Sequence, residues 1–166
     1  MARLVLVGLP GAGKSTLARA LGEQWHCGVI DTDDALAVAV GVPAAQYLRE
    51  RGESAFREEE LEVLRIALRS DGVVATGAGV VATPEARELL EGELTLWLDS
   101  DDDTLLARVG DGERPLLGDN HAQALIDLRQ KREGWYRSTS RARVDSSGSL
   151  EEVLLRVIEQ VERVNS

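Results

Sequence analysis

The sequence has few of the features that disulfide bonding, membrane insertion or binding to polyanions requires. Its one cysteine, Cys27, excludes a disulfide within the chain and fits a reducing compartment. The formal net charge of −10 argues against a nucleic acid or a membrane surface as partner. No apolar run approaches the roughly 20 residues that span a bilayer, and no signal-peptide segment precedes the first apolar stretch. We therefore expect a soluble, cytoplasmic monomer whose partners are small molecules.

The composition is that of an ordinary globular protein, with 43% hydrophobic and 29% charged residues. A chain of 166 residues suits one domain with its own core. Short apolar stretches alternate with helical patterns, which is typical of parallel strands joined by covering helices. The sequence therefore predicts one α/β domain over residues 1–166, with three layers, α/β/α, around a five-stranded parallel sheet.

The boundaries of the elements follow from apolar periodicity and from helix start and stop signals. The predicted strands are 4–7, 29–30, 73–75, 94–98 and 142–145. The first predicted helix follows the loop after strand 4–7 and ends before residue 28, and the second, which is alanine-rich, ends at residue 40. The other predicted helices are 43 to about 52, 54–70, 84–90, 100–109, 122–138 and 150 onward. A polar, glycine-containing segment, about 110–121, is predicted to be a mobile lid.

A phosphate-binding loop is the strongest motif in the chain. Residues 8–15 fit the pattern G-x-x-x-x-G-K-[ST] directly after the first apolar strand and before a helix. Glycines let the backbone turn tightly and direct N–H groups inward, and the helix N-terminus adds partial positive charge, so a polyphosphate is the expected ligand. Lys14 is placed to reach the β- and γ-phosphates, and the Ser15 hydroxyl is placed to bind Mg²⁺.

Two further groups follow the second and third predicted strands. Ligands of open α/β sheets bind beyond the carboxyl ends of the strands, where this chain has the acidic residues 31–34 and the glycine-rich loop 77–79. We expect the side chains of Asp31 and Asp33 to point in different directions from an extended backbone, one towards the Mg²⁺ region and one towards an acceptor hydroxyl. Helix capping is the alternative role for both residues.

Cations that neutralise a transferred phosphoryl group or hold an acceptor come from predicted helices. Arg57 precedes Glu60 by three residues, a spacing that is also typical of an exposed ion pair on a helix surface. Arg132 and Tyr136 share one helix face in the same way. The two histidines have no companion ligands in the sequence, so neither is expected to bind a metal.

Six motifs follow one another along nearly the whole chain. They are 8–16, Asp31-Thr32-Asp33, Gly52-Glu53 with 56–60, the loop at Gly77, Arg114-Pro115-Leu116-Leu117, and Arg132 with Tyr136. Only the first motif is widely shared among phosphate-loop proteins. Taken in this order, the motifs resemble the shikimate kinase family, small phosphate-loop kinases related in fold to nucleoside monophosphate kinases.

The resemblance implies transfer of the ATP γ-phosphate to the 3-hydroxyl of shikimate, a step towards aromatic amino acids. It implies catalytic roles for Lys14, Asp33 and Arg114, and Mg²⁺ binding by Ser15 and Asp31. The implied ATP-binding residues are Gly11, Ala12, Gly13, Lys14, Ser15, Thr16, Arg108 and Arg114. The implied shikimate-binding residues are Asp33, Arg57, Gly77, Ala78, Gly79 and Arg132.

The chain departs from the family at Ala78, where the family usually has the second of three glycines. A Cβ at this position is expected to crowd the acceptor, and it would cost on the order of 1 kcal/mol if the backbone needed a positive φ. Two alternatives therefore stay open. One is a related kinase for another polyhydroxy acid such as gluconate, and the other is a nucleotide-binding regulator that has lost turnover.

Overall fold

A parallel β-sheet forms the centre of the computed structural model, which describes residues 1–109 and 120–166. The strands pair side by side in the order β2-β3-β1-β4-β5, and every pair is parallel. Their bounds are β1 Leu4–Val7, β2 Val29–Asp31, β3 Val73–Ala75, β4 Thr95–Asp99 and β5 Ala142–Asp145. The predicted α/β class and the five-stranded parallel sheet are thus confirmed.

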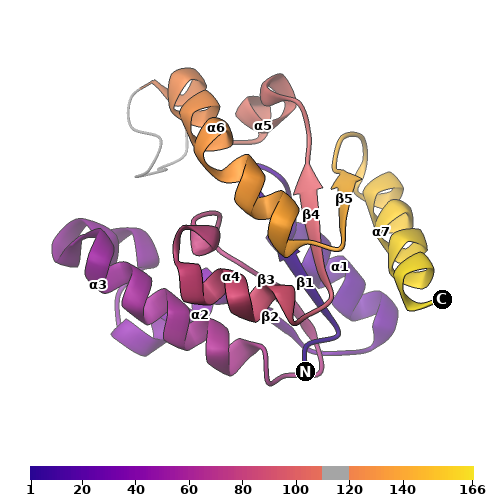
Figure 1. The fold of residues 1–166 in the computed structure, drawn as a ribbon, viewed down its shortest axis with the longest axis horizontal. Helices are drawn as coiled ribbons and strands as arrows, with labels where there is room; N and C mark the ends of the chain where they lie inside the picture. Colours follow the sequence, from indigo (N-terminus) through magenta and orange to yellow (C-terminus); the bar gives the residue numbers. More distant parts are fainter. Residues whose placement is uncertain (110–119) are drawn as a thin grey trace.

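Helices cover both faces of this sheet, as Figure 1 shows, with α4 and α6 in front of it and α1 behind. On one face α1 packs against α7, and on the other α4 packs against α6. The helices are α1 Lys14–Trp25, α2 Thr32–Val40, α3 Ala44–Ala67, α4 Pro84–Glu91, α5 Asp102–Val109, α6 His121–Thr139 and α7 Leu150–Asn165, with a short 3-10 helix, η1, at Val80–Ala82.

The core forms where the two helical layers meet the sheet. All four residues of β1 are fully buried, as expected for a central parallel strand that is covered on both faces. Trp97 on β4 and Tyr136 on α6 are among the largest fully buried side chains, and their rings stack with centroids 6.0 Å apart. This contact holds α6 against the sheet.

Most helix ends lie within two residues of their predicted positions, and the exceptions have local causes. Gly52, with φ 86° and ψ 169°, kinks α3 at the place where the sequence predicts a break between two helices. The capping box of Ser149 and Glu152 is present at the start of α7. Thr83 precedes Pro84 as predicted, but its side chain makes no capping hydrogen bond. The 3-10 helix η1 was not predicted.

The strand order decides where functional loops meet. The chain leaves β1 for β2 and β3 on one side and then crosses to β4 and β5 on the other, so the carboxyl end of β1 lies at the reversal of direction. The phosphate loop follows β1 at this point. Groups on β2 and β3 therefore flank it on one side, and groups after β4 and β5 flank it on the other.

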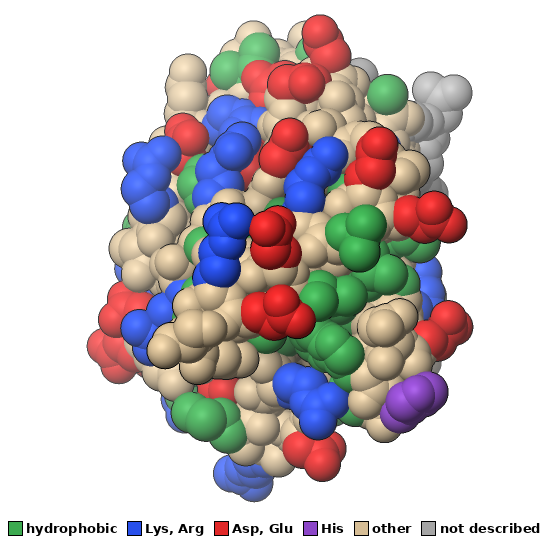
Figure 2. All heavy atoms as spheres, turned by 90° about the vertical axis from the view of Figure 1, so that its right-hand side faces the viewer, with side chains coloured by type: hydrophobic (Ala, Val, Ile, Leu, Met, Phe, Trp, Pro, Cys, Tyr) green, Lys and Arg blue, Asp and Glu red, His purple; other side chains and the backbone are tan. Residues whose placement is uncertain are grey.

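The surface is mixed in charge on the face that carries α7. Figure 2 shows acidic and basic side chains interleaved there around a band of hydrophobic side chains. Leu155 on α7 is two-thirds exposed. No helix in the described ranges is long and apolar enough to cross a membrane.

Candidate active site

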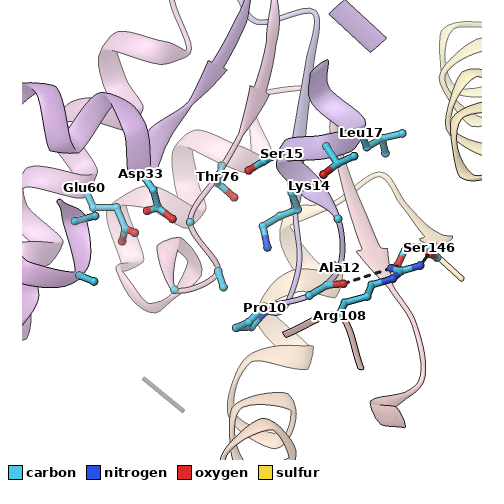
Figure 3. Close-up of a pocket in the computed structure, with 18 of the residues that line it drawn as sticks. Pro10, Ala12, Lys14, Ser15, Leu17, Asp33, Glu60, Thr76, Arg108 and Ser146 are labelled. Carbon is cyan, nitrogen blue, oxygen red and sulfur yellow. Dashed lines mark hydrogen bonds between the residues drawn. The ribbon is translucent and has the colours of Figure 1, made fainter. Parts of the chain in front are cut away.

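A cleft of about 580 Å³ opens at the carboxyl edge of the sheet. Its walls are residues 10–17 of the phosphate loop and α1, residues 76–79 after β3, and side chains from α2, α3, α5 and the turn before α7. In Figure 3, Lys14 lies between the carboxylates of Asp33 and Glu60 on one side and Arg108 with Ser146 on the other. The cleft therefore has a carboxylate-bearing half and a half that faces β5 and α7.

The phosphate loop has the geometry that its sequence predicts. Gly11 and Gly13 have φ values of 85° and 88°, which side chains with a Cβ rarely adopt. Gly13 precedes α1 as its N-cap and supplies no side chain, so the first N–H groups of the helix lack a side-chain cap. Lys14 donates from Nζ to the carbonyl oxygens of Gly8, at 2.7 Å, and Leu9, at 3.1 Å. The loop thus holds its own lysine over the cleft.

Asp31 caps a helix and also contacts the phosphate loop. Its Oδ1 caps α2 by accepting from the backbone N–H groups of Asp33, at 2.9 Å, and Asp34, at 3.2 Å. Its Oδ2 accepts a hydrogen bond from the Ser15 hydroxyl. Helix capping therefore fixes the carboxylate in the orientation that brings its second oxygen to the phosphate loop.

Asp33 reaches the other side of the cleft, but for a different reason from the predicted one. The expectation of an extended backbone through this residue is wrong, because Asp33 lies in the first turn of α2. Residues two apart on a strand share a face, whereas a helical turn separates them. The Asp33 Oδ1 atom lies 2.8 Å from the point that a Cβ on Gly77 would occupy, so this glycine leaves the room that the carboxylate uses.

Arg57 and Glu60 form a buried ion pair rather than the exposed pair that their spacing also allowed. The Arg57 Nη1 atom donates to Glu60 Oε1 at 2.8 Å, and the two side chains are only 11% and 3% exposed. Burial raises the pKa of Glu60 to about 7, although the charge and hydrogen bond of Arg57 oppose this rise. The Asp33 carboxylate, which shares the space beside Gly77, also raises it.

Arg132 enters the same region from α6 and is 4% exposed. Its Nε and Nη1 atoms, together with Nε and Nη2 of Arg57, are buried and have no hydrogen-bond partner within the described part of the chain. A buried donor without a partner costs about 1–3 kcal/mol. Two guanidinium groups with unused donors thus lie near Asp33 and Glu60, which suits an anionic ligand.

The loop 77–79 is fixed from both sides of the cleft. The Gly77 N–H donates to the buried hydroxyl of Thr32 at 3.0 Å, and the Tyr136 hydroxyl donates to the carbonyl oxygen of Ala78. His26 is the one described non-glycine residue with a positive φ, so the expected strain at Ala78 is absent. A Cβ on Gly79, by contrast, would lie 2.5 Å from Nη1 of Arg57.

Arg108 lies on the opposite side of the phosphate loop from these carboxylates (Figure 3). Its Nη1 donates to the Gly11 carbonyl oxygen at 3.3 Å, and its Nη2 donates to the carbonyl oxygen of Ser146. The arginine therefore joins the phosphate loop to the turn between β5 and α7. Arg114 and most of the predicted lid fall outside the described residues.

The comparisons with known proteins agree with this geometry. The family model described as shikimate kinase matches residues 10–162. The chain belongs to the shikimate kinase family. It is therefore an ATP-using enzyme of aromatic amino acid biosynthesis with shikimate kinase activity, and the alternatives of a gluconate kinase and an inactive regulator are not supported.

Individual shikimate kinases match nearly the full chain. The enzyme of Enterococcus faecalis is 30% identical over 97% of this chain and 99% of its own length. The enzyme of Mycobacterium avium is 38% identical over 87% of this chain and 84% of its own length. A solved shikimate kinase from Acinetobacter baumannii, in complex with shikimate, has a TM-score of 0.92 and 28% identity, and covers 96% of this chain and 92% of that one.

Three residues in or beside the cleft of this shikimate kinase were not predicted as site residues. Thr32 looks like part of the acidic turn, and only the pairing of β2 with β3 shows that it meets Gly77. Glu60 belongs to the 56–60 motif and to the predicted pair with Arg57, but the sequence gives it no role of its own in the site. Tyr136 forms a motif with Arg132 on one helix face, and this spacing of four residues indicates that the two side chains are neighbours, but the sequence assigns Tyr136 no role.

Proposed function

We propose that this enzyme binds shikimate in the half of the cleft lined by Asp33 and Arg57, beside the buried Arg132, and transfers the ATP γ-phosphate to its 3-hydroxyl. The observation that carries the proposal is the set of buried donors on the two arginines that make no hydrogen bond within the described residues, although Arg57 Nη2 lies 3.6 Å from Glu53 Oε1. A planar guanidinium pairs with both oxygens of a carboxylate, which is the anionic group of shikimate. The complex of the Acinetobacter baumannii enzyme with shikimate supports the same substrate here.

The proposed role of Asp33 is to hold the acceptor hydroxyl and to take its proton during transfer. A carboxylate at hydrogen-bonding distance from a hydroxyl can act in this way. Glu60 is the other carboxyl group beside Gly77, but its Oε1 atom already accepts a hydrogen bond from Arg57 in a buried ion pair. Asp33, which lines the cleft at the first turn of α2, is therefore the better base.

The loop 77–79 forms the proposed wall against the bound acceptor. Gly77 and Gly79 are needed because a Cβ on either would meet Asp33 or Arg57. Ala78 lies between them and also lines the cleft. In this proposal the methyl group of Ala78 is a tolerated variation rather than a change of substrate.

The nucleotide is proposed to occupy the other half of the cleft. Its phosphates would accept hydrogen bonds from the loop Gly11-Ala12-Gly13 and from the first turn of α1, with Lys14, Ser15 and Thr16. Arg108 would contact the base, and Arg114 would add positive charge near the γ-phosphate.

The residues present fit an Mg²⁺ ion. The Ser15 hydroxyl and Asp31 Oδ2 are adjacent oxygen atoms beside the phosphate loop, and oxygen is the ligand that Mg²⁺ prefers. No group of three or more His, Cys, Asp or Glu residues that could hold a metal occurs within 1–109 and 120–166. The Mg²⁺ ion of a kinase needs no such group, because one or two protein groups bind it together with the substrate phosphates. When bound, it neutralises charge on the phosphate oxygens.

We also infer a single kinase domain over 1–166, since the family model spans nearly the whole chain. We propose that this domain acts as a cytoplasmic monomer. The decisive experiment is a steady-state ADP-release assay with Mg-ATP and shikimate, gluconate, quinate or no acceptor. Saturable turnover with shikimate alone is the expected result. ATP binding without stimulation by shikimate would overturn the proposed acceptor site.

A further inference from the structure

Tyr136 lies at the back of the acceptor half of the cleft, and no step of the proposed reaction uses it. The residue is fully buried on α6, and its ring stacks on Trp97 with an interplanar angle of 23°. Its hydroxyl donates to the carbonyl oxygen of Ala78, 58 positions earlier in the chain. The side chain is thus fixed by the sheet on one side and by the cleft loop on the other.

Arg132 lies one helical turn earlier on α6, near enough to act on the pKa of this hydroxyl. Burial raises the pKa of Tyr136 to about 12, and the charge and hydrogen bond of Arg132 oppose that rise. At neutral pH the phenol is therefore protonated. It can donate its proton to Ala78 while its oxygen accepts from the guanidinium of Arg132.

The position of the Ala78 loop affects several groups of the acceptor site. Gly77 adjoins Asp33 and Glu60, and Gly79 adjoins Arg57, each closely enough that an added Cβ would collide. A small displacement of the loop would therefore change the space around all three side chains. One hydroxyl on α6 thus meets both the loop that bounds the acceptor site and an arginine of that site.

We propose that Tyr136 is a positioning residue for the acceptor, which fixes the Ala78 loop and the Arg132 guanidinium relative to each other through its single hydroxyl. The inference rests on the proposed role of Arg132 in shikimate binding. Tyr136 has no contact with the phosphate loop in this role, so its effect belongs to acceptor binding and not to nucleotide binding.

The test compares Tyr136→Phe with Thr139→Val in the full chain. Thr139 is a matched control, since it also buries a hydroxyl on α6 but donates it only to carbonyls of its own helix. We expect Tyr136→Phe to raise the KM for shikimate about tenfold, with kcat within about threefold and the KM for ATP within about twofold. Thr139→Val should leave both KM values unchanged.

Different results separate positioning from structural support. A purely structural residue would lower the active fraction, and hence the apparent kcat, without moving the KM for shikimate. An unchanged KM for shikimate, or an equal rise for ATP and shikimate, would overturn the inference. If the wild-type enzyme itself failed to use shikimate, the proposed function would fail instead.

If Tyr136→Phe does not fold, a second variant tests the same inference. 4-Aminophenylalanine, incorporated at position 136, keeps an N–H donor for the Ala78 carbonyl but is a poor acceptor for Arg132. It should preserve the loop and still raise the KM for shikimate about threefold or more, with no change for ATP. Unchanged KM values for both substrates would show that the Tyr136 hydroxyl does not position Arg132.

Discussion

The two halves of the cleft differ in how their polar groups are satisfied. In the nucleotide half, Lys14 is hydrogen-bonded to carbonyls of its own loop and Arg108 to Gly11 and Ser146. In the acceptor half, Arg57 and Arg132 keep buried donors without partners inside the described chain. The nucleotide half is preorganised largely by main-chain atoms, whereas the acceptor half relies on charged side chains from separate helices.

This difference has consequences for mutation. A site built from main chain tolerates changes in its neighbours, because the loop and helix α1 define it. A site built from converging side chains depends on every element that orients them. Substitutions in the acceptor half should therefore change the KM for shikimate selectively, and the KM for ATP should change little.

The largest effect is expected from Asp33→Asn. The amide keeps the size of the side chain but cannot accept the proton of the acceptor hydroxyl, so kcat should fall about 100-fold or more. ATP binding and thermal stability should stay close to those of the wild type. Asp34→Asn is the control, since it changes the neighbouring exposed carboxylate in the same first turn of α2. Near-normal turnover of Asp33→Asn would remove this residue from the mechanism.

Arg132→Ala tests the selectivity of the acceptor half most directly. Loss of charged hydrogen bonds to the shikimate carboxylate should raise its KM roughly 10- to 100-fold, with little change in the KM for ATP. Steady-state kinetics with each substrate varied in turn would measure both values. Arg137→Ala, which removes an exposed arginine from the same helix, should leave them unchanged. Equal losses for shikimate and ATP would indicate a structural role for Arg132.

The nucleotide half could be predicted from the sequence because it is local. Residues 8–16 contain the turn, the lysine and the helix start in one continuous stretch, so spacing alone defines their geometry. The fold followed from the same kind of evidence, since strand and helix periodicity repeats along the chain. Short features without periodicity were predicted less well: η1 was missed, and the backbone at Asp33 is helical rather than extended.

The acceptor half could be predicted only in part, because its contacts join distant segments. The sequence supplied Arg57 and Arg132 through the family resemblance, but not the burial of the Arg57 pair with Glu60. The hydrogen bond from Tyr136 to Ala78 has no local signal at all, because it depends on the packing of α6 against the sheet. Such contacts are fixed by tertiary packing and not by spacing.

The protonation of Glu60 gives a pH-dependent test of this buried cluster. Its pKa rises from 4.5 to about 7 in the fold, so between these pH values the folded state keeps a proton that the unfolded state has released. Stability should therefore fall as the pH rises through this window, by on the order of 2–3 kcal/mol in total. Chemical denaturation at pH 5 and 7.5 would measure the change.

Glu60→Gln removes this titration and keeps an acceptor for Arg57. The unfolding free energy of the variant relative to the wild type should increase between pH 5 and 7.5. Glu58→Gln, which alters an exposed carboxylate on the same helix, should follow the wild-type profile. Parallel curves of unfolding free energy against pH for Glu60→Gln and the wild type would show that burial does not raise the pKa of Glu60.

Gly79→Ala probes the close approach of the loop to Arg57. The backbone of Gly79 has φ −91° and ψ 3°, which alanine can adopt, but the new Cβ would displace the guanidinium. We expect the KM for shikimate to rise about fivefold to tenfold, with little change in melting temperature, since a flexible side chain can move away. Gly134→Ala is the control, because a Cβ there meets nothing within 4 Å. Equal kinetics in the two variants would contradict the close approach.

The smallest effect is expected from Ala78→Gly, which restores the residue usual in the family. Ala78 needs no positive φ, and its carbonyl oxygen is held by Tyr136, so glycine relieves no backbone strain. The more flexible residue should lower the unfolding free energy by roughly 0.5–1 kcal/mol and change the KM for shikimate by less than about threefold. Thermal denaturation and shikimate titration would measure both values. A tenfold or larger fall in the KM would show that the methyl group crowds the acceptor, and the selectivity of this half of the cleft would then depend on Ala78 itself.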